Sequence, residues 1–537
     1  MYLNFWDIGV FVLFIGIVVV FSMLKSRKET TGEDFFLAGR GLVWWLIGIS
    51  LIAANISTEQ FVGMNGSGAG GVGLAIASYD WIAAITLVLV AIFFLPRLLR
   101  TGIYTIPEYL EYRYNSAARG IMSFYMMIIY VAVTISAVLY SGGLTIQTIF
   151  GDMNNHHHLV YSIWLIGIIA GIYTTYGGLK AVAWADLLQG SALIAGGLCV
   201  LVAAFSAVGG LENFWAHSHS RMHMILERDH LELPWTALLM GIWIPNLYYW
   251  GFNQYIAQRT LAARSLKHGQ LGVLMAAGIQ VLLPLIIVIP GIIAVQLYGN
   301  ELHTSDAAFP LLIRKLIPPG LKGFIFAAIA GAVISSLASM LNSAATIFTM
   351  DLFKRHIHKD ASSKSLITIG RVMTVVFVLL GCLIAPYLSD PRFRGIFHYI
   401  QDFQGYASPG ILACFLFGFF VKRAGANAGV TGLLLNIPVY GMLHLNSDFM
   451  EKTGLRGKWG MLDRMAISCE QICFLNKMAI TFTIIVMVMA VITLVKPLKT
   501  PVMMPRNKAF DLKPAPSVVW IGCVIIIITL ALYVIFR

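Results

Sequence analysis

Polar side chains interrupt a long apolar stretch near the beginning of the chain, in SLIAANISTEQFVGMNGSGAGG, residues 50–71. The run from Asn55 to Gln60 places amide, hydroxyl and carboxyl groups next to one another. Such groups can hydrogen-bond a small polar molecule, and unwound backbone at the same place can offer carbonyl oxygens to a cation. The alternative is that these side chains only join neighbouring helices through hydrogen bonds.

A second apolar stretch is interrupted in a similar way, because GIWIPNLYYWGFNQYIAQR carries Pro245 and Asn246 in its interior. Proline removes a helical hydrogen bond and its ring clashes with the preceding turn, so we expect the helix to be broken here. Broken backbone is tolerated inside a membrane only where it lines a protein cavity. Paired interruptions of this kind point to a binding site near the middle of the membrane.

The composition is that of a polytopic membrane protein. Of the 537 residues, 58% are hydrophobic and 12% are charged, whereas soluble proteins carry about 25% charged residues. Apolar stretches of about 20 residues, each long enough to cross the membrane as a helix, recur along the chain. We therefore expect an all-α fold with 14 transmembrane helices, since a β-barrel would show short alternating segments. The expected helices cover residues 5–24, 43–63, 72–99, 120–149, 159–176, 181–208, 235–257, 269–298, 318–350, 365–388, 396–421, 426–445, 474–496 and 516–536.

The distribution of charge predicts the orientation of the chain. Lys and Arg number 37 against 25 Asp and Glu, a net charge of +12. The cluster Lys25, Arg27 and Lys28 follows the first apolar segment, which lacks the features of a cleaved signal. By the positive-inside rule both termini are predicted outside, in an integral protein of the plasma (inner) membrane. The same rule explains the positive charge, so no nucleic acid partner is expected.

The two interrupted segments stand five apart in segment order, which predicts two inverted repeats of five helices each. The chain would then be a single transmembrane domain, residues 1–537, with interrupted first and sixth core helices. The repeats would cover residues 43–208 and 235–421. One flanking helix would precede them at 5–24, and three would follow within 426–537.

Five motifs resemble those of a known family: SLIAANISTEQFVGMNGSG, GIYTIPEYLEYRY, YGGLKAVAWADLLQ, NLYYWGFNQYIAQRTLAA and ISSLASMLNSAATIFTMD. They are similar to the sodium/solute symporter family, within it to the sodium/glucose cotransporter branch, and most closely to the bacterial galactose-transporting members of that branch. The resemblance runs from about residue 35 to residue 420 and weakens after that. It implies two inverted five-helix repeats with one helix before them and three after, which agrees with the 14 segments.

The resemblance implies one sodium site between the first and eighth core helices. The implied ligands are the carbonyl oxygens of Ala53, Ile56, Ala332 and Ser335 and the hydroxyl of Ser336. Ser336 stands four residues after Ala332, so both lie on one helix face; the alternative is that the serine hydroxyls bond back to their own helix. Asp186, a carboxylate within a core span, is implied to lie on the cation path. Sodium would be the coupling ion, and no organic cofactor is expected.

The resemblance also implies a sugar site, in which amides and a carboxylate bond the hydroxyl groups and an aromatic ring covers the apolar face. The implied substrate-binding residues are Asn55, Gln60, Asp80, Asn246, Tyr249, Gln280 and Gln401. Tyr249 would be the inner gate beneath the sugar, held by Asn246. The outer gate would consist of Met64, Tyr79 and Phe397. The alternative for Tyr249 and its aromatic neighbours is a belt at the membrane surface.

Three positions depart from the pattern of the galactose-transporting members. Asp80 stands where they have glutamate, Gln280 where they have lysine, and Ala83 where they have serine. A site built to hydrogen-bond one hydroxyl discriminates strongly against analogues that lack it. These changes argue against galactose and leave glucose, another hexose or an inositol open. Loss of the lysine beside a retained carboxylate argues against anionic substrates.

We therefore expect a sodium-coupled symporter that imports a sugar, a hexose or a related polyol, by alternating access. The alternatives are a sodium-independent sugar facilitator, a sodium-dependent sugar sensor, and a symporter of another neutral solute such as an inositol. An enzyme is not expected, because the histidines within 156–158 and 217–230 lie in predicted outer loops without the spacing of a zinc hydrolase. The particular sugar, the sodium stoichiometry and the oligomeric state stay open.

Overall fold

Helices make up the regular structure of the described part of the chain. The computed structural model describes residues 4–25, 31–150, 156–302, 304–389, 396–444, 469, 471–507 and 510–537. Within these ranges β-type pairing is confined to two isolated bridges, Leu42 with Ala263 and Leu226 with Pro234. The prediction of an all-α fold is confirmed.

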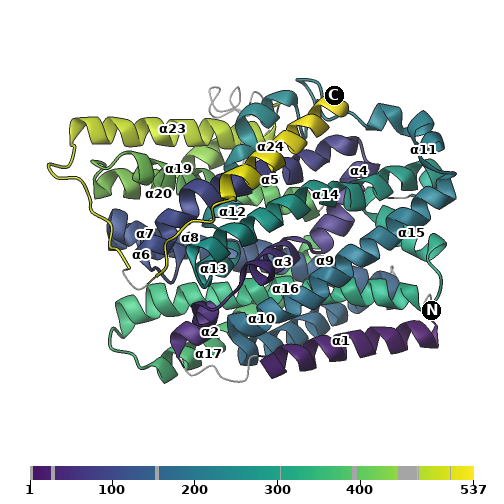
Figure 1. Cartoon of the computed structure of the whole chain (residues 1–537), viewed down its shortest axis with the longest axis horizontal. Helices are drawn as coiled ribbons and strands as arrows, with labels where there is room; N and C mark the ends of the chain where they lie inside the picture. Colours follow the sequence, from purple (N-terminus) through teal and green to yellow (C-terminus); the bar gives the residue numbers. More distant parts are fainter. Residues whose placement is uncertain are drawn as a thin grey trace, which may run out of the picture.

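Most of the long helices run roughly along the longest axis of the molecule and pack into one bundle (Figure 1). The first group of helices comprises α1 (Phe5–Lys25), α2 (Gly32–Leu37), α3 (Trp44–Asn55), η2 (Glu59–Met64), α4 (Asn65–Ala69), η3 (Gly73–Ala77), α5 (Ser78–Leu89), η4 (Val90–Phe94), α6 (Leu95–Thr101), α7 (Ile106–Arg113), α8 (Ser116–Ile128), η5 (Ile129–Ile135), α9 (Ser136–Phe150), α10 (His156–Val208) and α11 (Leu211–Ser218). The second comprises η7 (Ala237–Gly241), α12 (Trp243–Phe252), α13 (Gln254–Leu261), α14 (Leu266–Tyr298), η9 (Ser305–Ala307), α15 (Ala308–Leu316), α16 (Leu321–Ile347), η10 (Phe348–Ile357), α17 (Ser363–Ile384), α18 (Ile396–Gln404), α19 (Ser408–Phe420), α20 (Ala426–Leu443), α23 (Phe474–Val495) and α24 (Val518–Ile535).

Ten of the described helices are long and apolar enough to cross a membrane, or up to eleven when the bent pair Trp44–Asn55 and Glu59–Ala69 is counted as one span. Shorter apolar helices cover His157–Ile172 and Ser408–Phe420. Helical residues occupy each of the segments predicted from the sequence. The chain is thus an integral membrane protein with many spans, while the count of 14 and the inverted repeats stay predictions.

The first interrupted segment bends by 58° between α3 and the η2–α4 pair. Helix α3 ends at Asn55, and Ile56 is extended, with φ −80° and ψ 110°. The last carbonyl groups of a helix have no intrahelical partner, although the Ile56 amide still bonds the Ile52 carbonyl at 2.8 Å. The carbonyl groups from Ala53 onward, at the end of α3, are therefore free of helical hydrogen bonds. This is the place where the polar run from Asn55 to Gln60 predicts a break.

The second interrupted segment breaks at Asn253, between α12 and α13, and not at Pro245 and Asn246 as predicted. Pro245 stands near the start of α12, where a missing N–H removes no helical hydrogen bond. The π-helical turn η7 ends at Gly241, and Ile242 separates it from α12. Asn253 is extended, with φ −77° and ψ 126°, and its side-chain oxygen accepts a hydrogen bond from the Tyr130 hydroxyl.

Two further stretches are divided by breaks. Gly178 has φ 50° and ψ −169° and divides α10 in two, because glycine tolerates positive φ without steric cost. The two halves match the predicted segments 159–176 and 181–208. Helix α18 ends at Gln404 and α19 begins at Ser408, so Gln401 lies in the last turn before a break.

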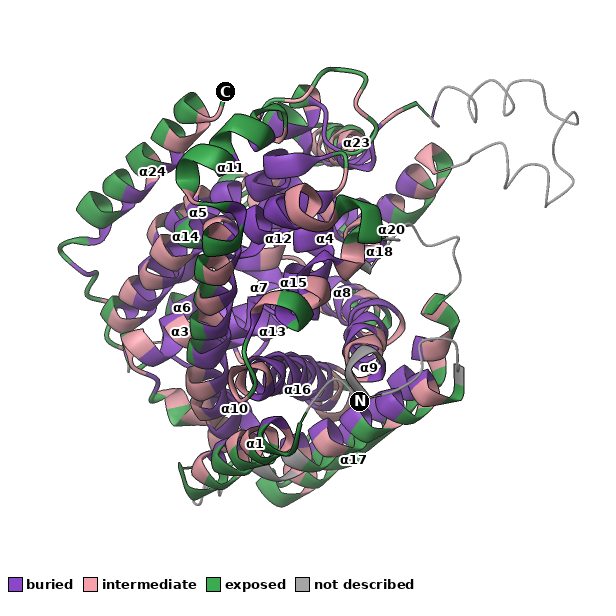
Figure 2. Ribbon diagram, turned by 90° about the vertical axis from the view of Figure 1, so that its right-hand side faces the viewer, coloured by how far each residue is buried: buried purple, intermediate pink, exposed green. Residues whose placement is uncertain are grey.

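Helix α16 is the central element of the bundle. In the most apolar 18-residue stretch of the span Leu321–Ile357, 89% is buried, against 17% in the corresponding stretch of α1 at the periphery. Figure 2 shows the same contrast, with buried residues in the middle and exposed ones along α1, α17 and α24. Exposed apolar side chains on these outer helices suit contact with lipid. The buried Asp7 of α1 caps the start of α16, since its Oδ1 accepts hydrogen bonds from the amides of Gly320 at 2.6 Å and Gly323 at 2.9 Å.

Candidate functional site

A central cavity of about 590 Å³ lies between the two broken segments. Its walls come from α3, η2, α5, α12, α14 and α18, which are far apart in the sequence. All seven residues implied for the solute line it: Asn55, Gln60, Asp80, Asn246, Tyr249, Gln280 and Gln401. The fold therefore brings together groups that the sequence shows only as separate polar positions.

Unpartnered polar atoms line this cavity. Gln280 donates a hydrogen bond from Nε2 to Asp80 Oδ1 at 2.5 Å. Asp80 Oδ2 and Gln280 Oε1 are buried, and neither has a hydrogen-bond partner among the described residues; the same holds for Asn55 Nδ2 and Gln60 Oε1. A buried polar atom without a partner costs about 1–3 kcal/mol. A polar solute placed among these three acceptors and one donor would remove that cost.

Tyr249 lies on the cavity wall beside the second break. Its hydroxyl accepts a hydrogen bond of 2.5 Å from Tyr255, and the two rings meet edge to face with centroids 5.7 Å apart. Tyr249 was predicted to be held by Asn246, but the Asn246 amide donates to the Ile242 carbonyl at 3.1 Å instead. Tyr255 stands just after Asn253, so the break itself brings the second tyrosine under the first.

Tyr79 and Phe397 separate the central cavity from a second one. Their rings pack edge to face with centroids 5.0 Å apart, and both residues line both cavities. The second cavity, here called the vestibule, measures about 810 Å³ and also includes Glu232 and Asp306. Burial raises the pKa of the Asp306 carboxyl to about 6. Met64 is fully buried and lines neither cavity.

The residues implied for sodium lie on α3, just after it, and on α16, and these two helices pack against each other. Ala53 and Ile56 are at the break of α3, and Ala332, Ser335 and Ser336 are buried in α16. The Ser336 Oγ is buried and has no hydrogen-bond partner among the described residues, although a buried hydroxyl usually bonds back to its own helix. An orphaned hydroxyl on α16 and the free carbonyls at the end of α3, a helix that packs against it, are neutral oxygens of the kind that fits sodium.

Asp186 is already paired with a cation of the chain. Arg259 Nη2 lies 2.8 Å from its Oδ2, and both side chains are fully buried. Ser50 and Ser335 donate hydrogen bonds to the same carboxylate, and Arg259 also donates to Ser339 at 2.5 Å. This network joins α3, α10, α13 and α16 next to the residues implied for sodium.

Several residues of the central cavity were not predicted. Those with polar or aromatic side chains are Glu59, Thr134, Trp250, Tyr255 and Gln404. Glu59 was visible as a carboxylate within an apolar segment. Ala83 lines the same wall, where the family pattern has serine. The other positions depend on helix rotation and on the break at Asn253, for which the sequence gives no direct signal.

The histidine clusters lie at or between the ends of predicted spans. Residues 156–158 begin helix α10, and His217 lies in α11, a short helix in the connection between the predicted spans 181–208 and 235–257. In the described ranges no three His, Cys, Asp or Glu side chains come together to hold a metal ion.

Two stacked cavities, with aromatic side chains between them and broken helices on the wall, are an arrangement that suits a secondary transporter. The sequence profile of the Sodium:solute symporter family matches residues 35–435. The chain belongs to that family, whose members are membrane transporters.

Individual relatives agree with this assignment. The chain is 42% identical to the "Sodium/glucose cotransporter" of Vibrio parahaemolyticus over 467 residues, which cover 81% of this chain and 84% of that protein. It is 34% identical to "Sodium/myo-inositol cotransporter 2" of Sus scrofa, over 83% of this chain and 70% of that one. A solved structure of a Na⁺-coupled sialic acid symporter matches with a TM-score of 0.77 at 21% identity, covering 93% of this chain and all of the other, which shows the shared fold.

Proposed function

We propose that this protein is a sodium-coupled symporter of a small, neutral, polyhydroxylated solute: a sugar, either a hexose or a related polyol. The observation that carries the proposal is the set of orphaned polar atoms on Asn55, Gln60, Asp80 and Gln280 around one cavity. These atoms can serve alternating donor and acceptor groups of a ring carrying several hydroxyls. Tyr249 offers the aromatic face that the apolar side of such a ring prefers.

The charge of the cavity wall favours a neutral solute. Among the described residues of its lining there is no lysine or arginine. An anionic solute would find no counter-charge there, and a buried charge without a partner is costly. We therefore propose that this protein shares the fold of the sialic acid symporter but not its anionic solute. The inositol cotransporters among the relatives keep an inositol as the second candidate within the same chemical class.

Sodium binding would organise the solute site through the broken helix. The carbonyls of Ala53 and Ile56 belong to the same turn as Asn55, so a cation held between them and Ser336 would fix the position of that amide. We propose one sodium per solute, because the Asp186 carboxylate is already neutralised by Arg259. In the cycle that follows, the Tyr79 and Phe397 rings open to the vestibule, and Tyr249 later moves away from Tyr255 to release the solute on the other side. Both termini are proposed to lie outside.

Uptake into proteoliposomes tests the proposal. A panel of labelled hexoses and myo-inositol is offered with and without an inward sodium gradient. We expect one solute to enter only with sodium, and Ser336→Ala to raise the sodium concentration for half-maximal uptake about tenfold. Ser22→Ala is the matched control, since the Ser22 hydroxyl bonds only its own helix, at the Val18 carbonyl, 2.6 Å away. Uptake that ignores sodium would favour a facilitator; sodium-dependent binding without uptake would favour a sensor.

A further inference from the structure

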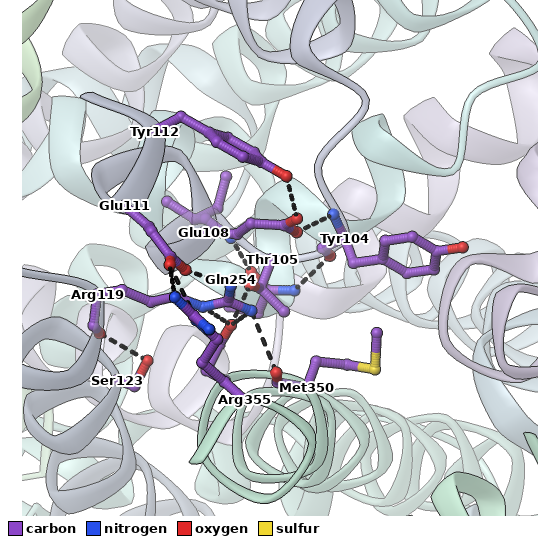
Figure 3. A network of polar contacts seen from close by, with 12 residues as sticks. Tyr104, Thr105, Glu108, Glu111, Tyr112, Arg119, Ser123, Gln254, Met350 and Arg355 are labelled. Carbon is purple, nitrogen blue, oxygen red and sulfur yellow. Dashed lines mark hydrogen bonds and ion pairs between the residues drawn. The ribbon is translucent and has the colours of Figure 1, made fainter. Parts of the chain in front are cut away.

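A third cavity, of about 680 Å³, lies away from the solute site and is here called the basic cavity. Its wall consists of Tyr104, Glu108, Arg119, Met350, Lys354, Arg355 and Lys359. These residues come from the start of α7 and the turn before it, from α8, and from η10 with the turn after it. Figure 3 shows the polar network to which several of these residues belong, with Arg119 and Arg355 pointing toward Glu111.

The wall carries more positive charge than its own acids neutralise. Arg119 and Arg355 share Glu111, at 2.7 and 2.5 Å, and Arg119 also pairs with the buried Asp351 at 2.5 Å. Glu108 is occupied by the Tyr104 amide at 2.8 Å and the Tyr112 hydroxyl at 3.0 Å.

The two lysines of the wall stand outside its ion pairs. Among the described residues, neither Lys354 nor Lys359 has an acidic partner within ion-pair distance. Asp360 follows Lys359 in the chain but is not part of the wall. With Glu108, Glu111 and Asp351 set against Arg119, Lys354, Arg355 and Lys359, the basic cavity keeps one positive charge in excess. Its two ammonium groups lie beside a base of paired arginines, which suits a ligand with a compact negative charge.

The place of the basic cavity in the bundle indicates where this anion comes from. The helix Leu321–Ile357 has 37 residues, far more than the roughly 20 that cross the hydrocarbon, so its last turns with Lys354 and Arg355 reach the headgroup region. Arg119 lies near the start of the span Ser116–Gln147. Met350 adds an apolar patch next to the charged groups. The basic side chains, the apolar contact at Met350 and the position near the headgroup region together suit a lipid.

We propose that the basic cavity binds the phosphodiester headgroup of an anionic phospholipid, with Lys354 and Lys359 as the principal contacts. Basic pockets between membrane helices are suited to such headgroups, and each Lys or Arg near the surface contributes attraction to them. The bound lipid joins η10 to α7 and α8 and thereby stabilises this end of the bundle. This binding is independent of which solute the central cavity takes and of whether sodium drives its transport.

Thermal unfolding of the purified full chain in uncharged detergent tests the proposal, with dioleoyl-phosphatidylglycerol, dioleoyl-phosphatidylcholine or inorganic phosphate added. We expect phosphatidylglycerol alone to raise the unfolding temperature. In Lys354→Gln/Lys359→Gln the apparent affinity for phosphatidylglycerol should fall about 30-fold, and in Lys359→Gln about fivefold. The matched control is Lys364→Gln/Lys422→Gln, which removes two exposed lysines outside the basic cavity and should respond as the wild type does.

Two results would overturn the proposal. If the double variant and its control respond equally to phosphatidylglycerol, the two lysines do not bind the lipid headgroup. Stabilisation by inorganic phosphate as large as that by phosphatidylglycerol would mean that the cavity takes a free anion from the aqueous phase. Equal unfolding temperatures of all variants in phosphatidylcholine verify that the substitutions leave the fold intact.

Discussion

The Asp80–Gln280 pair sets the chemistry of the central cavity at the scale of single residues. Gln280 orients the carboxylate through one oxygen and leaves the other, together with its own amide oxygen, without a partner. Two adjacent acceptors of this kind suit a pair of neighbouring hydroxyl groups on a ring. No basic side chain stands in the described part of the lining, which agrees with the proposal of a neutral solute.

Substitution of Asp80 tests its contact with the solute. Asp80→Asn keeps the shape and removes the charge, and a hydrogen bond to a charged group contributes about 1.5–3 kcal/mol. We expect the half-saturating solute concentration to rise about tenfold to a hundredfold, while the sodium concentration for half-maximal uptake stays within about twofold. Initial rates of uptake measure both. An unchanged half-saturating solute concentration would exclude Asp80 from the solute site.

The hydrogen bond between Tyr255 and Tyr249 tests the inner gate. Tyr255→Phe deletes the donor of that bond and keeps the ring packing. The loss of about 0.5–1.5 kcal/mol should destabilise the closed gate and raise the rate of solute efflux from preloaded proteoliposomes about threefold to tenfold. Efflux at the wild-type rate would show that the bond does not hold the gate closed.

At the scale of residues, the sequence predicts which side chains carry polar chemistry better than it predicts which of them pair with each other. Asp80 and Gln280 were recognisable as polar side chains in apolar segments that match a family pattern. The pairing of Asp186 with Arg259 was not, since the two residues lie on α10 and α13 and meet only in the folded bundle. Tyr255 was missed because its role depends on the turn made at Asn253.

At the scale of helices, Asp7 is the clearest example of one element stabilising another. Its carboxylate caps the start of α16, the helix that carries the implied sodium ligands. Asp7→Ala leaves two buried amide groups without their acceptor, so we expect the unfolding free energy to fall by about 2–3 kcal/mol. Asp7→Asn, which keeps an acceptor oxygen, should lose about half as much. Chemical or thermal denaturation in detergent measures the difference, and equal stability of all three proteins would contradict the capping role.

The two broken helices show how well the sequence pattern alone can locate a break in a helix. The run from Asn55 to Gln60 marks its break directly, because polar groups are costly within an apolar span unless a cavity accommodates them. Pro245 misled the prediction, since proline in the first turn of a helix is compatible with regular geometry. The true break at Asn253 lacks proline and depends on the bond from Tyr130, a contact between distant segments.

At the scale of the whole molecule, the central cavity and the vestibule lie on either side of the Tyr79–Phe397 contact. The all-α class followed from composition and segment length. The stacking of the two cavities did not, because it depends on how helices far apart in the sequence rotate against each other.

Access to the central cavity from the vestibule should be controlled by that aromatic contact. In a background with the exposed Cys523 replaced by serine, we place a reporter thiol by Ala83→Cys, on the wall of the central cavity. Adding Tyr79→Ala should increase its labelling by a membrane-impermeant maleimide about tenfold, since the contact of the two rings is lost. Tyr161→Ala, at an exposed aromatic position on an outer helix, is the control. Equal labelling in both variants would mean that the vestibule is not the route to the cavity.

Coupling between sodium and solute is the central claim, and accumulation against a gradient tests it most directly. Proteoliposomes hold a membrane potential of about 100 mV, negative inside, with equal sodium on both sides and the same low concentration of labelled solute inside and out. One sodium per solute supplies about 2.3 kcal/mol at this potential, so the internal solute should rise toward about 50 times the external concentration. In Ser336→Ala the accumulation should begin more slowly when sodium is kept below the variant's raised half-maximal concentration. A ratio that stays at one in the wild type, despite rapid solute exchange, would contradict symport and leave a facilitator.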